Sequence, residues 1–123
     1  MSAPPRPLAP AGPATGSLPL EIDPAELAGL RNGSEPYALL DVREPWELAI
    51  CGFAEAIHLP LGGLAGLEHE LPGDRPLIVA CHSGRRSLLA TAHLRRLGFG
   101  RAVSLRGGLE AYALEVDPTM ARY

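Results

Sequence analysis

The segment CHSGRRS, residues 81–87, combines a cysteine with a glycine and two arginines. It directly follows the apolar run LIVA at 77–80 and precedes a leucine-containing stretch that predicts a helix. At such a junction, the unpaired backbone N–H groups and the positive end of the helix dipole stabilise an anion. A cysteine beside them is favoured as the thiolate, which is its nucleophilic form. We therefore expect Cys81 to be a catalytic nucleophile.

The other residues of this segment are expected to bind an anion next to the cysteine. Gly84 allows the loop to curl with its amides inward, since a tight nest requires a residue that tolerates positive φ. Arg86 lies five positions after Cys81 and is expected to fold back over the mouth of the loop and hold an anionic substrate. Arg85 is expected either to contact the same anion or to project outward. His82 has a second interpretation, as a solvent-facing side chain. The residues expected to bind substrate are Arg86, Arg85, His82, Ser83, Gly84 and Ser87.

The remaining cysteine and the histidines form no metal or redox motif. Cys51 has no basic neighbours in the sequence, and we expect it to be a packing residue. The two cysteines lack CxxC spacing, and the four histidines lack a ligand spacing such as HExxH. The sequence therefore predicts neither a metal nor a cofactor. Two cysteines without a disulfide pattern also favour reduced thiols and a cytoplasmic location.

Composition excludes several classes of protein. A net charge of −3 argues against a dedicated nucleic-acid binder, and no run approaches the roughly 18 apolar residues of a membrane-spanning helix. Residues 1–17 carry five of the 13 prolines and are expected to be a disordered tail. A secretory signal is the competing interpretation, but prolines interrupt every candidate apolar core there. Residues 18–123 are then long enough for one domain with an ordinary core.

Short apolar runs alternate with helical segments from residue 18 onward, which is typical of an α/β fold. Because these runs are apolar throughout, we expect a mostly parallel central sheet with helices on both faces. Ligands bind beyond the carboxyl ends of the strands in such sheets, and Cys81 occupies that position. In the helix after it, Thr91 and Arg95 are expected to share the solvent side. Strands are expected at 20–22, 37–42, 56–59, 77–80 and 102–105, and helices or turns at 23–30, 44–50 and 86–97.

Four segments together resemble the single-domain rhodaneses, a family of sulfurtransferases: LLDVREPWE (39–47), AIHLPL (56–61), CHSGRRS (81–87) and LRGGLEAY (105–112). The resemblance covers residues 18–123 and implies a rhodanese-like fold and a two-step thiosulfate sulfurtransferase reaction. In that reaction, Cys81 takes the outer sulfur of an anionic donor such as thiosulfate as a persulfide and passes it to a thiol or to cyanide. Asp41 and Arg43 belong to the DVR motif, which implies a structural pair that supports the loop.

The expected partners are a small anionic sulfur donor and a thiol or protein that accepts the sulfur, with no nucleic acid and no membrane. The tail from Val116 to Tyr123 also resembles rhodanese domains attached to adenylylating enzymes that sulfurate ubiquitin-like carriers. Two positions depart from the family pattern: Glu55 stands where a glycine is usual, and Tyr112 where a tryptophan is usual.

Two other functions stay open at this point. A persulfide relay module would receive its sulfur from a partner protein in sulfur-carrier or cofactor biosynthesis, and the same cysteine would serve it. A cysteine-dependent phosphatase or arsenate reductase is disfavoured because those enzymes place five residues between cysteine and arginine. Here four residues separate Cys81 from Arg86, and a shorter loop fits one sulfur atom better than a phosphate.

Overall fold

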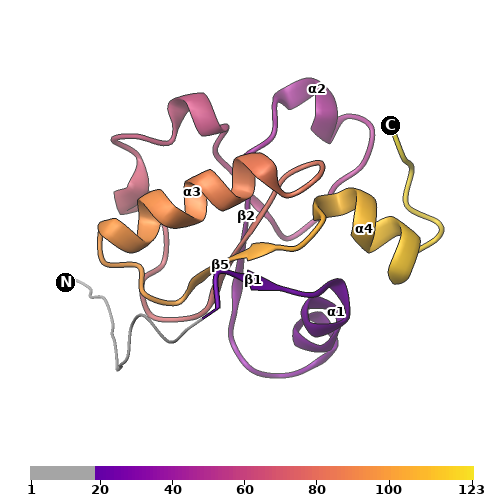
Figure 1. Cartoon of the computed structure of the whole chain (residues 1–123), viewed down its shortest axis with the longest axis horizontal. Coiled ribbons are helices and arrows are strands. Elements are labelled where there is room, and N and C mark those ends of the chain that lie inside the picture. The colour runs from indigo at the N-terminus through magenta and orange to yellow at the C-terminus, as the bar shows by residue number, and fades with distance from the viewer. Residues whose placement is uncertain (1–18) are drawn as a thin grey trace.

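Five short strands form one parallel sheet in residues 19–123, which are the residues described by this computed structural model (Figure 1). Each neighbouring pair of strands is parallel, and the spatial order is β1-β5-β4-β2-β3. The strands are β1 (Glu21–Ile22), β2 (Ala38–Asp41), β3 (Ile57–His58), β4 (Leu77–Ala80) and β5 (Ala102–Leu105). The predicted α/β fold with a parallel sheet is confirmed. The tail expected at 1–17 lies outside the described residues.

The helices are α1 (Pro24–Asn32), α2 (Pro45–Leu48), α3 (Arg85–Arg96) and α4 (Gly108–Glu115), with short 3₁₀ turns η3 (Leu61–Gly63) and η4 (Glu68–Glu70). Helix α1 begins after its N-cap residue Asp23, whose backbone N–H donates to Glu26 Oε1 at 2.9 Å. Helix α4 was not among the predicted elements, because a pair of glycines at its start is a poor helix signal. No helix within residues 19–123 has the length and apolar character needed to cross a membrane.

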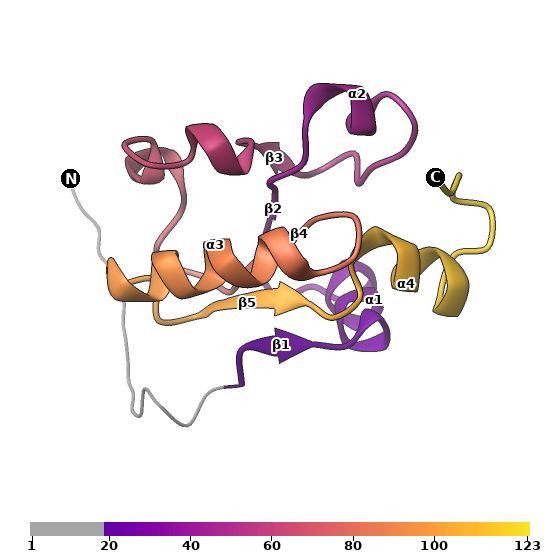
Figure 2. The same ribbon diagram turned by 45° about the horizontal axis from the view of Figure 1, so that its top comes forward.

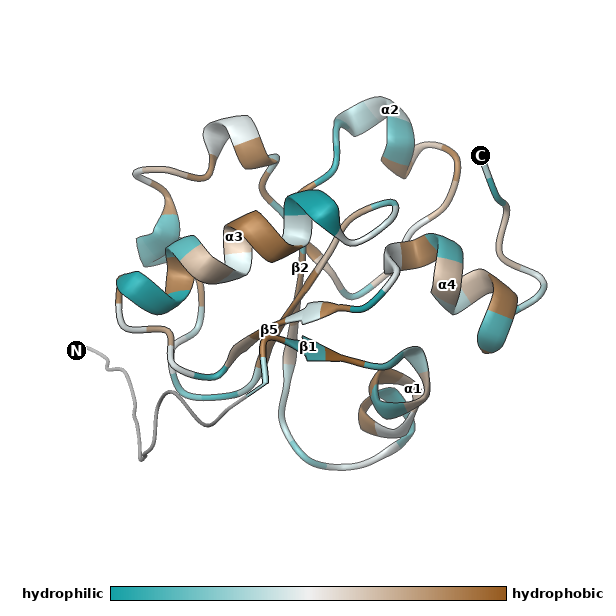
Figure 3. Cartoon of the chain, in the orientation of Figure 1, coloured by the Kyte–Doolittle hydropathy of each residue, from teal (hydrophilic) through white to brown (hydrophobic). Residues whose placement is uncertain are grey.

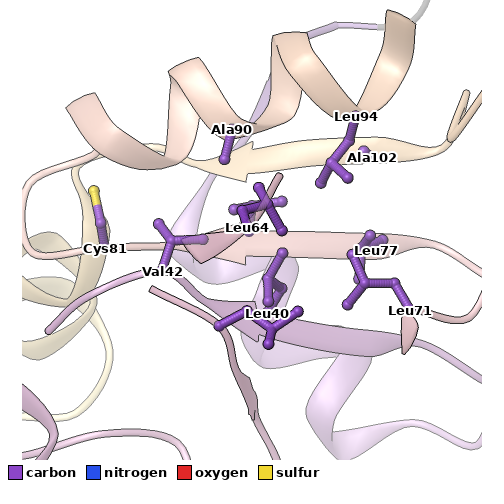
Figure 4. Packing of buried hydrophobic residues seen from close by; sticks show 11 residues of the cluster. Leu40, Val42, Leu64, Leu71, Leu77, Cys81, Ala90, Leu94 and Ala102 are labelled. Atoms are coloured by element: carbon purple, nitrogen blue, oxygen red, sulfur yellow. The ribbon is translucent and has the colours of Figure 1, made fainter. Parts of the chain in front are cut away.

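The core lies on both faces of the sheet because side chains alternate along each buried strand. In β4, Leu77 and Val79 pack into a cluster under α3, whereas Ile78 and Ala80 face the opposite cluster with α1 and α4. Figure 3 shows brown, hydrophobic residues along much of the central strands, and Figure 4 shows Cys81 at one end of the α3-side cluster. Helices therefore cover both faces, as predicted.

Helix α3 packs along β4 and β5 and so fixes where the loop before it lies (Figure 2). Its buried residues Ser87, Ala90, Thr91 and Leu94 follow the i, i+3, i+4, i+7 pattern of one helix face. The prediction that Thr91 lies on the solvent side is wrong, since this side chain is fully buried. The error came from treating only apolar residues as core-facing, whereas small polar residues complete this buried face.

Candidate active site

Cys81 directly follows β4, and its sulfur lies inside the loop that joins this strand to α3. The residue is 1% exposed. Its Sγ accepts hydrogen bonds from the backbone N–H groups of Gly84 at 3.1 Å and Ser87 at 3.3 Å. The thiol also lies 3.4 Å from Ser87 Oγ, which in turn lies 2.7 Å from the buried Ser104 Oγ of β5. Two backbone amides that converge on one sulfur stabilise negative charge on it.

The curl of the loop depends on Gly84, the N-cap residue of α3. Its φ is +98°, a left-handed conformation that side chains other than glycine rarely adopt. A Cβ there would also lie 3.1 Å from the backbone nitrogen of Gly107. Both features require glycine at this position. The left-handed conformation turns the amide of Gly84 inward to the sulfur.

The N-terminus of α4 holds the same loop from behind. The amide of Leu109 donates to the carbonyl oxygen of Cys81 at 2.9 Å, and the amide of Glu110 donates to that of His82 at 3.1 Å. Gly108 makes this approach possible, because a Cβ at that position would lie 2.3 Å from the Cys81 carbonyl oxygen. The paired glycines directly after β5 are the sequence signal for this contact.

Arg86 forms a bidentate ion pair with Glu47 of α2. Its Nη1 lies 2.6 Å from Glu47 Oε2, and its Nη2 lies 2.8 Å from Glu47 Oε1. The Arg86 guanidinium lowers the pKa of the Glu47 carboxyl to about 2, in spite of the burial of that group. The expected contact of Arg86 with an anionic substrate stays a prediction. Glu47 was missed because its partner is 39 residues away in sequence.

The remaining loop residues predicted to bind substrate differ in exposure. Ser83 and Arg85 are exposed, whereas Ser87 is fully buried beneath the sulfur. The ring of His82 packs against that of Tyr123, with 4.2 Å between centroids, so this face of the imidazole is covered. His82 Nδ1 is buried, and within residues 19–123 it has no hydrogen-bond partner.

Asp41 and Arg43 form the expected pair at the end of β2. Arg43 is fully buried, and its Nε and Nη2 donate to the Asp41 carboxylate at 2.8–3.1 Å. The guanidinium also donates from Nη1 to Tyr123 Oη at 2.9 Å and from Nη2 to the carbonyl oxygen of Cys51 at 2.8 Å. Burial opposes the charge of Arg43, but these hydrogen bonds with Asp41 and Tyr123 outweigh it and raise the pKa.

Cys51 is a half-buried free thiol that packs against the α1 side of the core. Together with His82, Glu110 and Tyr123 it lines a shallow surface depression beside the loop. Within residues 19–123, no three His, Cys, Asp or Glu residues come together in a group that could hold a metal ion.

Comparisons with known proteins agree with this geometry. A family model described as the rhodanese-like domain matches residues 23–115. A sulfurtransferase from Allochromatium vinosum is 37% identical over 101 residues, which span 82% of this chain and 94% of that protein. A probable adenylyltransferase/sulfurtransferase, MoeZ, from Mycobacterium tuberculosis is 35% identical over 104 residues, which span 83% of this chain but only 26% of MoeZ. The crystal structure of a rhodanese-related protein from Thermoplasma volcanium superposes with a TM-score of 0.71 at 32% identity, covering 78% of this chain and 92% of that one.

Proposed function

The chain belongs to the rhodanese-like domain family, and we propose that it is a thiosulfate sulfurtransferase whose sulfur carrier is Cys81. The sulfurtransferase class rests on relatives that this chain matches along nearly their whole length. The choice of thiosulfate rests on the chemistry of the loop, which offers several hydrogen-bond donors to a small anion.

The reaction takes place in two displacements. The Cys81 thiolate attacks the outer sulfur of thiosulfate, a new S–S bond forms, and the old S–S bond breaks with its electron pair leaving on sulfite. The acceptor then attacks the terminal sulfur of the persulfide. With cyanide this gives thiocyanate and returns the thiolate, so neither an oxidant nor a cofactor enters the balance.

The observation that carries this proposal is the pair of amides aimed at a buried sulfur. The Gly84 and Ser87 N–H groups lie 3.1 and 3.3 Å from Cys81 Sγ. They are fixed by the backbone, so they need no reorganisation when negative charge arrives or leaves. A persulfide is anionic at its terminal sulfur, and the same loop amides stabilise it.

The arginines at the start of α3 serve the anionic donor. Arg85 is exposed at the first position of the helix, where a cation attracts a dianion before it docks. Arg86 is one-third exposed beside its Glu47 partner and keeps donors for a second anion. The free thiols of both cysteines suit a reducing compartment such as the cytoplasm.

A second candidate function is a persulfide relay, in which a partner protein supplies the sulfur. It is favoured by the match to MoeZ, in which the similar region makes up about a quarter of a larger adenylyltransferase/sulfurtransferase. The two functions share Cys81 and differ in the donor. Turnover of several small donors supports the enzyme, whereas sulfur transfer only from a purified protein donor supports the relay.

Incubation with thiosulfate tests the proposal directly. We expect the mass of one sulfur atom to be added to the peptide that contains Cys81, and cyanide to remove it. Cys81→Ser should abolish the gain, whereas Cys51→Ser should leave it unchanged. Addition of the sulfur to Cys51 instead, or to neither cysteine, contradicts the mechanism.

A further inference from the structure

The segment after α4 turns back toward α2, and Tyr123 meets the active site there (Figures 1 and 2). Its hydroxyl accepts a hydrogen bond from Arg43 Nη1 at 2.9 Å and donates one to Glu47 Oε1 at 2.8 Å. Its ring packs on the imidazole of His82, with 4.2 Å between centroids. Tyr123 therefore contacts the segment after β2, helix α2 and the cysteine loop at once.

The hydroxyl of Tyr123 completes a chain of charged contacts that ends at Arg86. Asp41 pairs with Arg43, Arg43 donates to Tyr123, and Tyr123 donates to the Glu47 carboxylate. Glu47 Oε1, which accepts this bond, also accepts from Arg86 Nη2. Movement of the phenol therefore changes the orientation of the carboxylate that holds the Arg86 guanidinium.

The ring of Tyr123 contacts the start of the cysteine loop. It covers His82, the residue next to Cys81, and both side chains line the same shallow surface depression. Trp46 of α2 packs edge-on against the same ring, with centroids 5.8 Å apart, which limits its rotation. One side chain thus contacts His82 directly and Arg86 through Glu47.

We propose that Tyr123 is a positioning residue for sulfur transfer, with its hydroxyl orienting Arg86 through Glu47 and its ring orienting His82. This role rests on the proposed function for what Arg86 and His82 do in sulfur transfer. The contacts of Tyr123 with the residues around it do not depend on that function. Burial raises the pKa of Tyr123 to about 12, so its hydroxyl keeps the proton that it donates to Glu47. Tyr123 acts through other residues and is not assigned a contact with the substrate.

Two variants separate the contribution of the Tyr123 hydroxyl from that of its ring. Tyr123→Phe removes the hydroxyl and keeps the ring on His82, whereas Tyr123→Leu removes both. Tyr112→Phe is the matched control, because Tyr112 Oη accepts a comparable hydrogen bond from Arg31 Nη1 at 3.0 Å. Tyr112→Phe loses one hydrogen bond and Tyr123→Phe loses two, so both variants should unfold at a somewhat lower temperature than the unsubstituted protein.

The first readout needs no sulfur donor. Cys81 is alkylated with anionic iodoacetate and with neutral iodoacetamide, and the labelled peptide is quantified by mass spectrometry. Because Arg86 attracts only the anion, Tyr123→Phe should lower the ratio of the two rates about threefold, and Tyr112→Phe should not change it. An unchanged ratio in Tyr123→Phe, or an equal fall in Tyr112→Phe, overturns the positioning role.

The second readout is thiosulfate:cyanide turnover. Tyr123→Phe should raise KM for thiosulfate about threefold with kcat within about twofold of the unsubstituted protein, and Tyr123→Leu should lower kcat as well. A fall in kcat with unchanged KM in Tyr123→Phe contradicts the proposal. If the unsubstituted protein takes no sulfur from thiosulfate, the proposed function fails, and the alkylation ratio still decides the role of Tyr123.

Discussion

At the scale of single residues, backbone amides bind the sulfur of Cys81, and one ion pair holds Arg86 beside the loop. The Cys81 Sγ accepts hydrogen bonds from the backbone amides of Gly84 and Ser87, which no side chain supplies. The Glu47–Arg86 pair, by contrast, depends on two side chains that meet across α2 and α3. Glu47 is 4% exposed in this pair, so removal of Arg86 would leave a buried charge without its cation.

The low pKa of Glu47 predicts how the stability of the protein changes with pH. Its folded-state pKa of about 2 lies below the ordinary 4.5, mainly because of the hydrogen bonds from Arg86. The stabilisation is therefore fully present above about pH 5 and is lost as the pH falls toward 2, with a total of about 3 kcal/mol. Glu47→Gln lacks this titration, so its free energy of unfolding should approach that of the unsubstituted protein as the pH falls through this range.

Denaturant unfolding at several pH values between about 2 and 7 measures this difference. Arg86→Met is the matching variant, because removal of the guanidinium removes the main cause of the low pKa and should flatten the same part of the pH profile. A gap between Glu47→Gln and the unsubstituted protein that stays constant down to pH 2 would show that the pair does not supply the stabilisation.

At the scale of elements, two helix N-termini meet the same loop from opposite ends of its backbone. The first turn of α3 supplies the Ser87 amide to the sulfur, and the first turn of α4 supplies amides to the carbonyl oxygens of Cys81 and His82. These amides have no partner within their own helices, so the loop satisfies donors that would otherwise be unpaired. The loop is thus held in shape by the two helices that follow β4 and β5.

Gly108 is the position at which this arrangement is most sensitive. It has φ of +65°, and a Cβ would lie 2.3 Å from the Cys81 carbonyl oxygen and 2.4 Å from that of His82. Gly108→Ala should therefore push α4 away from the loop, lower the free energy of unfolding by at least about 2 kcal/mol and reduce sulfur transfer more than tenfold. Thermal unfolding and the thiosulfate:cyanide assay measure the two effects.

Gly62→Ala is the control for this change, because a Cβ at Gly62 meets nothing within 4 Å. It should leave both stability and turnover near the values of the unsubstituted protein. Full activity in Gly108→Ala would mean that the contact between α4 and the loop is dispensable.

At the scale of the whole molecule, the features that sequence predicted are those set by neighbours along the chain. The apolar runs predicted the strands, and the junction of β4 and α3 predicted where Cys81 and Gly84 lie. Glu47 and Tyr123 carried no local signal, since their partners are 39 to 80 residues away and only the packed fold brings them together. The prediction for Thr91 failed for a related reason. The helical spacing of Thr91, and not the polarity of its hydroxyl, places it on the buried face of α3.

Contacts between residues distant in sequence also explain how this chain accommodates Glu55 where the family usually has glycine. The Glu55 carboxylate accepts from Arg31 Nε at 2.7 Å and from Tyr37 Oη at 2.9 Å, which joins α1 to the segment before β3. Arg31 in turn lies over the ring of Phe53, with 4.7 Å from its Cζ to the centroid, and bonds Tyr112 of α4. Glu55 therefore belongs to a cluster that ties α1 to α4.

Glu55→Gly tests whether that cluster serves stability alone. The Arg31 and Glu55 side chains are 29% and 36% exposed, so solvent screens their attraction, and the loss in free energy of unfolding should stay below about 1 kcal/mol. The ion pair weakens with salt, so the difference from the unsubstituted protein should shrink between low and high ionic strength. Sulfur transfer should stay within about twofold, because the cluster packs on the sheet face opposite the Cys81 side of the core. A large loss of turnover with little loss of stability would instead place Glu55 among the residues that shape the site.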